Sequence, residues 1–485
     1  MRRGAHEYSW RSPCSHHHGR IRGQTKHLVE CSSERRDLGR GDHVGSIITH
    51  GPRRIRHPLG QPYGDQVMTI AFTNTFTSDF VNAAAGSTLR TAEFVLPGHP
   101  DKLADAIADA IVQEARRRES RALVAIEVAL HRNIVFIDGR VACDEVQSMD
   151  FKKIAHEVYR SAGFTKPFVR RAMRLRVITD ICVGPLLPGE LELREVSDDQ
   201  SIVIGYASSL PGTDALPVEH ALARKLAMAL YALRCEQPEL CLGPDGKVIV
   251  FIEESHDARN FRVVDVSLSI QHTAQWNAVA ARRAIEARMH LAIEAFALAV
   301  PGFASSQDHT LTINGDGDFI EGGPHGDNGL SGKKLVADFY GPRVPIGGGA
   351  MSGKDFCKVD RAGPLIAREL ALAAVQRLGC RECLVTLGIR PGDREFRIVR
   401  VEAENRQRLD TTRLHGLVDM RLESKEYWPD QRGDLVQIAR WGHFTAERAV
   451  HPMLGDLCGS TSPEQMRAAV HAARRLGAKY VARPC

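Results

Sequence analysis

In the body of the chain, apolar residues switch between helical and strand spacing. Leu103, Ile107 and Ile111 recur every fourth residue, which predicts a helix with one buried face. The apolar run 123–137 that follows has strand-like composition and is interrupted by polar residues. It predicts a hairpin, with Asp138-Gly139 as the turn signal. The local unit is therefore a helix followed by two strands.

The same order returns twice further along the chain. We predict a second helix over 218–233 before strands over 247–253 and 261–270, and a third helix over 365–378, closed by Gly379, before strands over 384–389 and 396–401. Strand pairs interleaved with helices are typical of α+β sandwiches and not of a doubly wound parallel sheet. The pattern predicts an α+β fold with three related layers of sheet and helix.

The first 67 residues lack any sustained helical or strand period. They contain 12 Lys and Arg against 6 Asp and Glu, and 8 of the 21 histidines, including His16–His18. We expect a basic, disordered extension, or translated upstream sequence with initiation at Met68. Metal binding by the histidines and nucleic-acid binding by the arginines are alternatives. Because the other 418 residues carry a net charge of −1, nucleic acid is not an expected partner of the main body.

Composition places the chain among globular proteins. At 485 residues, 43% of them apolar and 25% charged, it is long enough for about three domains. No apolar stretch approaches the ~20 residues of a membrane span, and no signal-peptide pattern is present. The eleven cysteines have no paired spacing, and the lone CxxC at 380–383 has no second pair, so we predict neither a zinc site nor a redox site there. The expected location is the cytoplasm, with no membrane partner.

A glycine turn and a proline, in Gly-His-Pro-Asp-Lys at 98–102, lead into the first predicted helix. His99 and Lys102 then lie beside a helix N-terminus, which favours an anion such as phosphate. Asp101 is a candidate metal ligand. Two further aspartates follow at four-residue spacing, and we expect both to be solvated: Asp105 and Asp109.

Two glycine-rich segments, 322–334 and 347–361, carry four lysines within 26 residues: Lys333, Lys334, Lys354 and Lys358. Glycine lets backbone N–H groups approach an anion closely, and the lysines supply charge for a polyphosphate. Residues 348–354 match GxxxxGK, but a P-loop needs Ser or Thr next, where Asp355 stands, so we predict no P-loop. Asp360 is a candidate second carboxylate for Mg²⁺.

Taken together, these motifs resemble those of S-adenosylmethionine synthetase, the methionine adenosyltransferase family. The resemblance rests on GHPDK at 98–102, DQ followed by GYA at 199–207, DGK at 245–247, GGP and GDxGLSGKK at 322–334, and GGGAxSGKDxxKVDR at 347–361. The motifs occur in the family's order. With Ser269–His272 and Gly442–Phe444, the resemblance spans roughly 93 to 455.

The resemblance implies three related α+β domains, interleaved in sequence around a pseudo-threefold axis. We assign 68–97 and 211–322 to an N-terminal-type domain, 98–186 and 323–361 to a central domain, and 187–210 and 362–485 to a C-terminal-type domain. It also implies a homodimer or homotetramer with active sites between subunits.

The implied reaction is attack of the methionine sulfur on C5′ of ATP. The whole triphosphate leaves and is then hydrolysed to diphosphate and phosphate. Such a displacement requires alignment and charge stabilisation of the leaving group. The implied cofactors are two Mg²⁺ per site and K⁺, and the implied substrates are ATP and methionine or a related small molecule.

The family's site residues carry over onto matching positions of this sequence. His99, Lys247, Lys334, Lys354 and Lys358 would act on the triphosphate, Asp101 and Asp360 would bind Mg²⁺, and Glu127 would bind K⁺. Phe319 would stack on adenine. The other expected contacts to ATP or the second substrate are Glu93, Pro100, Lys102, Arg140, Asp199, Gln200, Asp245, Asp327, Lys333 and Ser352.

The sequence departs from the family at several of these places. Arg140 stands where a glutamate is expected for the methionine ammonium, which it would repel. The glycine-rich loop around the DQ pair is replaced by Val196, Ser197, Asp198 and Ser201. Two alternatives to S-adenosylmethionine synthesis therefore stay open. One is an enzyme of this fold with a different acceptor or with ATP hydrolysis alone, and the other is a non-catalytic ATP-binding regulatory homologue.

Overall fold

The structure is a computed structural model of the whole chain, and it describes residues 87–168, 175–304, 308–425 and 434–444. Chain contacts separate Met1–Phe76 from Thr77–Cys485, and every described residue belongs to the second unit. The expectation of a disordered extension over 1–67 lies outside the described residues.

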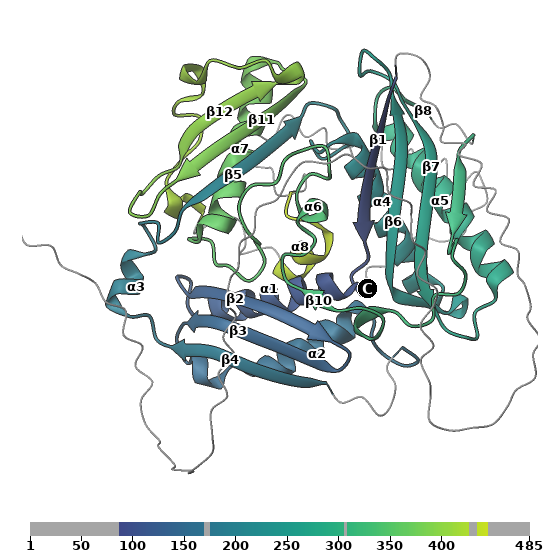
Figure 1. Ribbon diagram of the computed structural model, residues 1–485, viewed down its shortest axis with the longest axis horizontal. Helices are drawn as coiled ribbons and strands as arrows, with labels where there is room; N and C mark the ends of the chain where they lie inside the picture. Colours follow the sequence, from purple (N-terminus) through teal and green to yellow (C-terminus); the bar gives the residue numbers. More distant parts are fainter. Residues whose placement is uncertain (1–86, 169–174, 305–307, 426–433, 445–485) are drawn as a thin grey trace, which may run out of the picture. The chain divides into compact units, whose positions relative to one another are not determined.

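The first sheet has five strands (Figure 1). Its strands are β1 (Thr88–Val95), β6 (Leu242–Glu254), β7 (Phe261–His272), β8 (Phe303–Ala304) and β9 (Thr310–Ile313). β1, β6 and β7 are antiparallel neighbours, whereas β8 and β9 both run parallel to β7. Helix α4 (Val218–Glu236) contacts β1 and β6, and α5 (Ala278–Ala299) packs against α4.

The second sheet has the order β10-β2-β3-β4. These strands are β10 (Gly329–Leu330), β2 (Leu123–His131), β3 (Ile134–Ala142) and β4 (Arg176–Gly184). Helix α1 (Pro100–Arg118) contacts β2, and α2 (Phe151–Ala162) packs against α1 and β4. The parallel pairing of β3 with β4 was not anticipated, since the sequence indicated antiparallel pairs.

The third sheet has the order β12-β11-β5 and is covered by α7. These elements are β5 (Ser201–Ser208), α7 (Val359–Leu378), β11 (Glu382–Ile389) and β12 (Arg397–Ala403). The short helices are α3 (Pro188–Glu192), α6 (Leu335–Asp338) and α8 (Leu435–Trp441). Short 3₁₀ turns cover Val146–Ser148, Pro238–Leu240, Gly323–His325, Glu404–Arg406, Thr411–Leu414 and Leu422–Lys425.

Each sheet combines strands that are far apart in the sequence. β1 pairs with β6, β10 with β2, and β5 with β11, so the three sheets interleave along the chain. The α+β fold class is therefore confirmed, as are the three predicted helices and the strands that follow the second and third of them. The domain boundaries inferred from the family remain a prediction.

The predicted hairpin exists, but its turn lies elsewhere. The chain reverses at Arg132-Asn133, with Arg132 in the left-handed region at φ 54°, and Gly139 lies inside β3. Gly139 has φ 118°, and a Cβ there would lie 2.2 Å from the carbonyl oxygen of Ala125 on β2. Glycine is required by this close approach of two strands, not by a turn.

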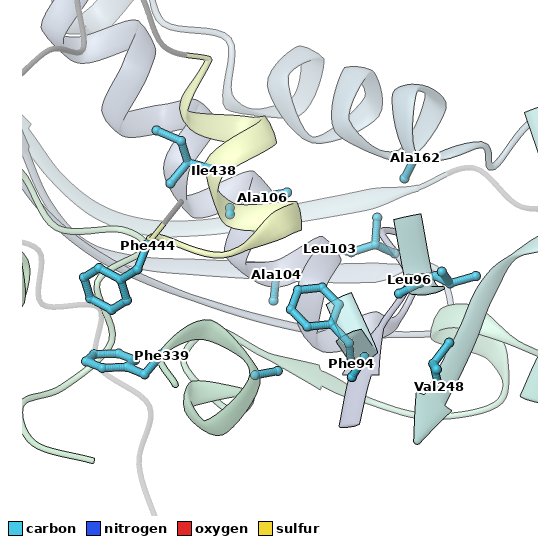
Figure 2. Close-up of a cluster of buried hydrophobic side chains, with 14 of the residues drawn as sticks. Phe94, Leu96, Leu103, Ala104, Ala106, Ala162, Val248, Phe339, Ile438 and Phe444 are labelled. Atoms are coloured by element: carbon cyan, nitrogen blue, oxygen red, sulfur yellow. The ribbon is translucent and has the colours of Figure 1, made fainter. Parts of the chain in front are cut away.

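The largest hydrophobic core joins the first two sheets to α1, α4 and α8. Figure 2 shows part of it, with labelled side chains from β1, the residue after it, α1, β6 and α8: Phe94, Leu96, Leu103, Ala104, Ala106, Val248 and Ile438. A second core lies between α7 and the third sheet. Among the described residues, no helix combines the length and apolarity needed to cross a bilayer.

Candidate functional site

His99 caps the N-terminus of α1, and Pro100 occupies the first position of that helix. The Asp101 amide donates to Nδ1 of His99 over 3.2 Å, so we assign the ring proton to Nε2. Burial, together with the charges of Lys247 and Lys334, lowers the pKa of His99 to about 3. The imidazole is therefore neutral at pH 7, with an N–H available to an anion.

Five charged residues lie around this histidine. Lys334 Nζ is 3.7 Å from Oε1 of Glu93, and Lys333 Nζ is 3.6 Å from Oδ1 of Asp101. Lys247 lies on β6, opposite Val95 at the end of β1. We call this set the His99 group: Glu93, His99, Asp101, Lys247, Lys333 and Lys334. It brings together six of the residues that the sequence predicted.

A second set gathers at the other glycine-rich segment. Lys354 Nζ lies 2.5 Å from Oε1 of Glu127, and Lys358 forms an ion pair with Asp198. We call these four residues the Lys354 group. Ser331, which is close in sequence to Lys333, donates to Oε2 of Glu127 over 2.5 Å. The Leu330 amide donates to Asp101, so residues 330–331 link the two groups.

Asp105 and Asp109 correct the sequence prediction, because both are buried and not solvated. Asp105 accepts the Gly332 amide at 2.8 Å. Asp109 accepts the Gly353 amide at 3.1 Å, and it also accepts from Arg361 and Ser352. The same face of α1 thus holds both glycine-rich segments, and a single sequence cannot show which distant amides meet a carboxylate.

Asp355 is a positioning residue that sequence reasoning missed. Its buried carboxylate accepts the amides of Val124 and Cys357, each at 2.8 Å. Arg194, also buried, donates to Asp355 over 2.8 Å and so connects the DQ loop to the lysine segment. The sequence signal for Asp355 was an Asp at the place where a P-loop has Ser or Thr. That signal excluded a P-loop but did not indicate a role for Asp355.

Two predicted contact residues have other partners. Lys102 is fully buried, pairs with Asp338 and donates to the carbonyl of Ala439 over 2.9 Å. The Ser352 hydroxyl is buried and donates to Asp109. We therefore assign both residues to the support of the site and not to contact with substrate.

The segment that follows β9 approaches the DGK residues, Asp245–Lys247, which lie in β6. Asp245 accepts the Gly323 amide at 2.7 Å, and burial raises the pKa of its carboxyl to about 6, an effect to which Asp327 adds. Phe319 is held by two bonds to His272: its amide donates to Nε2 over 3.0 Å, and its carbonyl accepts the His272 amide. The predicted adenine and DGK residues are thus positioned by neighbouring segments.

Asp199 and Gln200 lie exposed on the loop before β5. The Gln200 amide donates to Oδ1 of Asp199 over 2.7 Å, and the Asp199 amide donates to the Ser197 hydroxyl over 3.3 Å. Asp327, in the 322–334 segment, is also exposed and accepts the Asn328 amide at 2.8 Å. These polar groups remain accessible to a ligand.

Arg140 is not an isolated charge. Its guanidinium makes two parallel bonds of 2.9 Å to both carboxylate oxygens of Glu190 on α3. It also donates to the carbonyls of Cys182 and Pro185. This pair neutralises the positive charge and ties the connection after β4 to the sheet.

The carboxylates fit the implied Mg²⁺. Oδ2 of Asp101 is buried and has no hydrogen-bond partner among the residues that the structure describes. Asp360 accepts the Gly349 amide at 2.9 Å through Oδ1. Within the described ranges, no cluster of three or more His, Cys, Asp or Glu could hold a metal alone. Mg²⁺ typically takes one or two carboxylates and completes its shell with water and substrate phosphates.

The class of site follows from these contacts. Four lysines and a neutral histidine line two glycine-rich segments of an α+β protein, with two carboxylates suited to Mg²⁺. Such an arrangement suits an anion of several charges, because backbone amides and lysines together replace its hydration.

Comparison with known families gives the same result over most of the chain. Models of the S-adenosylmethionine synthetase family match residues 87–181 as the N-terminal domain, 194–319 as the central domain and 321–449 as the C-terminal domain. The chain belongs to the S-adenosylmethionine synthetase family, which confirms the resemblance. The sheets cross these boundaries, since β1 from the first range pairs with β6 from the second.

Proposed function

We propose that this protein transfers the adenosyl group of ATP to the sulfur of methionine, forming S-adenosylmethionine. The triphosphate released is then cleaved to diphosphate and phosphate. The observation that carries this proposal is that two linked groups gather on the two glycine-rich segments, one with His99, Lys333 and Lys334 and the other with Lys354 and Lys358. Family membership supports the same reaction.

The displacement at C5′ needs no proton transfer at the carbon. The sulfur gains a bond and becomes a sulfonium, while the C5′–O bond electrons leave with the triphosphate. In this proposal, the lysines hold the triphosphate and offset its growing charge, which lowers the barrier. His99, neutral at pH 7, donates a hydrogen bond from Nε2 and does not deliver a proton.

The other residues position the reactants. Asp101 and Asp360 would hold two Mg²⁺ with ATP, and these ions would neutralise part of the triphosphate charge. Glu127 would approach K⁺ after exchanging its present contacts with Lys354 and Ser331. Phe319 would stack on adenine, and Asp199, Gln200, Asp245 and Asp327 would face the adenosyl and methionine groups.

Methionine is favoured over an acidic acceptor. An acidic acceptor would bind Arg140 only by displacing Glu190 from a two-bond pair, which costs a charge-assisted contact. The neutral Arg140–Glu190 pair does not repel an ammonium as a free guanidinium would. Soluble cytoplasmic homodimers or homotetramers with shared active sites complete the proposal.

Mass spectrometry of products tests this function directly. The protein is incubated with ATP, Mg²⁺ and K⁺, with and without methionine. We expect S-adenosylmethionine only with methionine, together with diphosphate and phosphate. ATP breakdown without that product would indicate another acceptor or hydrolysis alone, and no ATP consumption would indicate a non-catalytic homologue.

A further inference from the structure

Each of the four lysines of the two glycine-rich segments is paired with a carboxylate of the same chain. The pairs are Lys333–Asp101, Lys334–Glu93, Lys354–Glu127 and Lys358–Asp198. Three of these carboxylates stand at positions to which the family motifs assign metal or nucleotide contacts. Asp198 has no such role, and it stands in a loop where the family resemblance indicates glycine-rich sequence.

The loop that carries Asp198 is fixed on both sides. The Ser197 amide donates to the carbonyl of Asp393, and the Gly392 amide donates to the carbonyl of Ser197, both over 2.9 Å. The Ser197 hydroxyl donates to the carbonyl of Asp199 over 2.5 Å. Three residues upstream, Arg194 is anchored on Asp355. Asp198 is therefore held beside Lys358 by its neighbours, and its contact does not depend on a freely moving loop.

The carboxylate of Asp198 resembles a phosphate oxygen in its charge and its acceptor geometry. Lys358 lies directly before α7, and its side chain is 16% exposed, so an incoming anion can reach it. An anion that approaches Lys358 competes with Asp198 for the ammonium and is repelled by the like charge of its carboxylate, and an anion that leaves restores the undisturbed pair.

We propose that Asp198 is an internal competitor for the polyphosphate position on Lys358, and this inference rests on the proposed function. It weakens the binding of substrate and product polyphosphate alike, and it favours product release by returning to Lys358. Asp198 is thus a residue that sets affinity and does not take part in the chemistry.

The test measures binding of inorganic triphosphate by titration calorimetry, in the presence of Mg²⁺. Asp198→Asn keeps the shape of the side chain and removes its charge. Because a partly exposed ion pair contributes up to about 1 kcal/mol, we expect triphosphate to bind about fivefold more tightly. In steady-state kinetics, inhibition by triphosphate should strengthen by the same factor.

Glu195→Gln is the matched control. Glu195 lies on the same loop and carries the same charge, but it pairs with Arg394, 3.0 Å away, outside the lysine set. This variant should leave triphosphate affinity within about twofold, since exposed pairs contribute little. In a Lys358→Gln background, Asp198→Asn should have no further effect, because the two residues act through one contact.

The outcomes separate this inference from the proposed function. Unchanged or weaker triphosphate binding by Asp198→Asn, with normal binding by the wild type, would overturn the competitor role alone. An equal gain in Glu195→Gln would do the same, because it would indicate only a general charge effect. Failure of the wild type and all variants to bind triphosphate would overturn both.

Discussion

At the scale of single residues, function in this protein depends on where charge is paired. Lys334, Lys354 and Lys358 pair with partly exposed carboxylates that an anion can replace. Lys102 and Arg361, in contrast, are buried with fixed partners. Lysines of the same sequence motifs thus divide into those that we propose bind the ligand and those that support the fold. We therefore expect substitutions in the first group to lower turnover and substitutions in the second group to lower stability.

Replacing Lys354 with alanine should impair turnover far more than stability. Losing one donor to the leaving group is expected to lower kcat/KM by about 10²–10³-fold. The melting temperature should stay within a few degrees, because Glu127, the partner left behind, is half exposed. Product formation and thermal unfolding are measured together, with exposed Lys152→Ala on α2 as control. Near-normal turnover in Lys354→Ala would contradict the site assignment.

Replacing Asp109 with asparagine should do the opposite and destabilise the fold. Arg361 would be left as a buried charge without its carboxylate, which typically costs about 3–5 kcal/mol. Urea unfolding measures this loss in the free energy of unfolding. The exposed Asp180→Asn on β4 should change it little, and equal effects at both positions would argue against the buried pair.

At the scale of elements, glycines allow backbone segments to approach one another. Gly139 permits β3 to lie against Ala125 of β2, and Gly353 lies against the Ile126 carbonyl of the same strand. The lysine segment is thereby brought to β2, where Glu127 stands. The geometry of the strand is therefore part of the geometry of the site.

Gly139→Ala should lower the free energy of unfolding by more than about 2 kcal/mol, because it adds a clash to a strained backbone. Gly189→Ala on α3 is the control, since a Cβ there would meet nothing within 4 Å. Chemical unfolding of both variants compares them. A loss at Gly139 no larger than at Gly189 would mean that the strands do not approach as described.

At the scale of the whole molecule, buried histidines make stability depend on pH. Burial, with Arg224 and Lys102 nearby, lowers the pKa of His220 to about 3. Between pH 6.5 and 3 the unfolded chain therefore binds a proton that the folded chain does not. The free energy of unfolding falls as pH falls through this window. Asp105 and Asp245, whose pKa values rise to about 6, act in the opposite direction between pH 6 and 3.8.

Comparing the wild type with a variant isolates the contribution of His220 to the pH dependence of the free energy of unfolding. His220→Gln should reduce the loss of unfolding free energy on acidification from pH 6.5 to pH 4 by about 1.4 kcal/mol per pH unit. Urea unfolding at several pH values of both proteins gives the two slopes. Parallel slopes would show that His220 binds its proton at the same pH in the folded and the unfolded chain, and so that folding does not lower its pKa.

The predictable part of the fold follows from local patterns. Neighbouring residues alone predict α1, through its four-residue apolar spacing, and the end of α7 at Gly379. The hairpin turn was placed wrongly because Asp-Gly has the same composition in a turn and at a close strand contact. Only the position of Ala125 on the facing strand distinguishes the two.

The sequence by itself determined the types of the main elements, the motif residues and the family, because each depends on residues close together in the chain. Tertiary structure alone decided which charges are buried and which lysines have a carboxylate partner that an anion can displace. It also decided that Arg140 is neutralised by Glu190. It also decided which strands pair, since β1 and β6 are separated by more than a hundred residues. The physical reason is that burial and ion pairing depend on distances in space, which local composition does not encode.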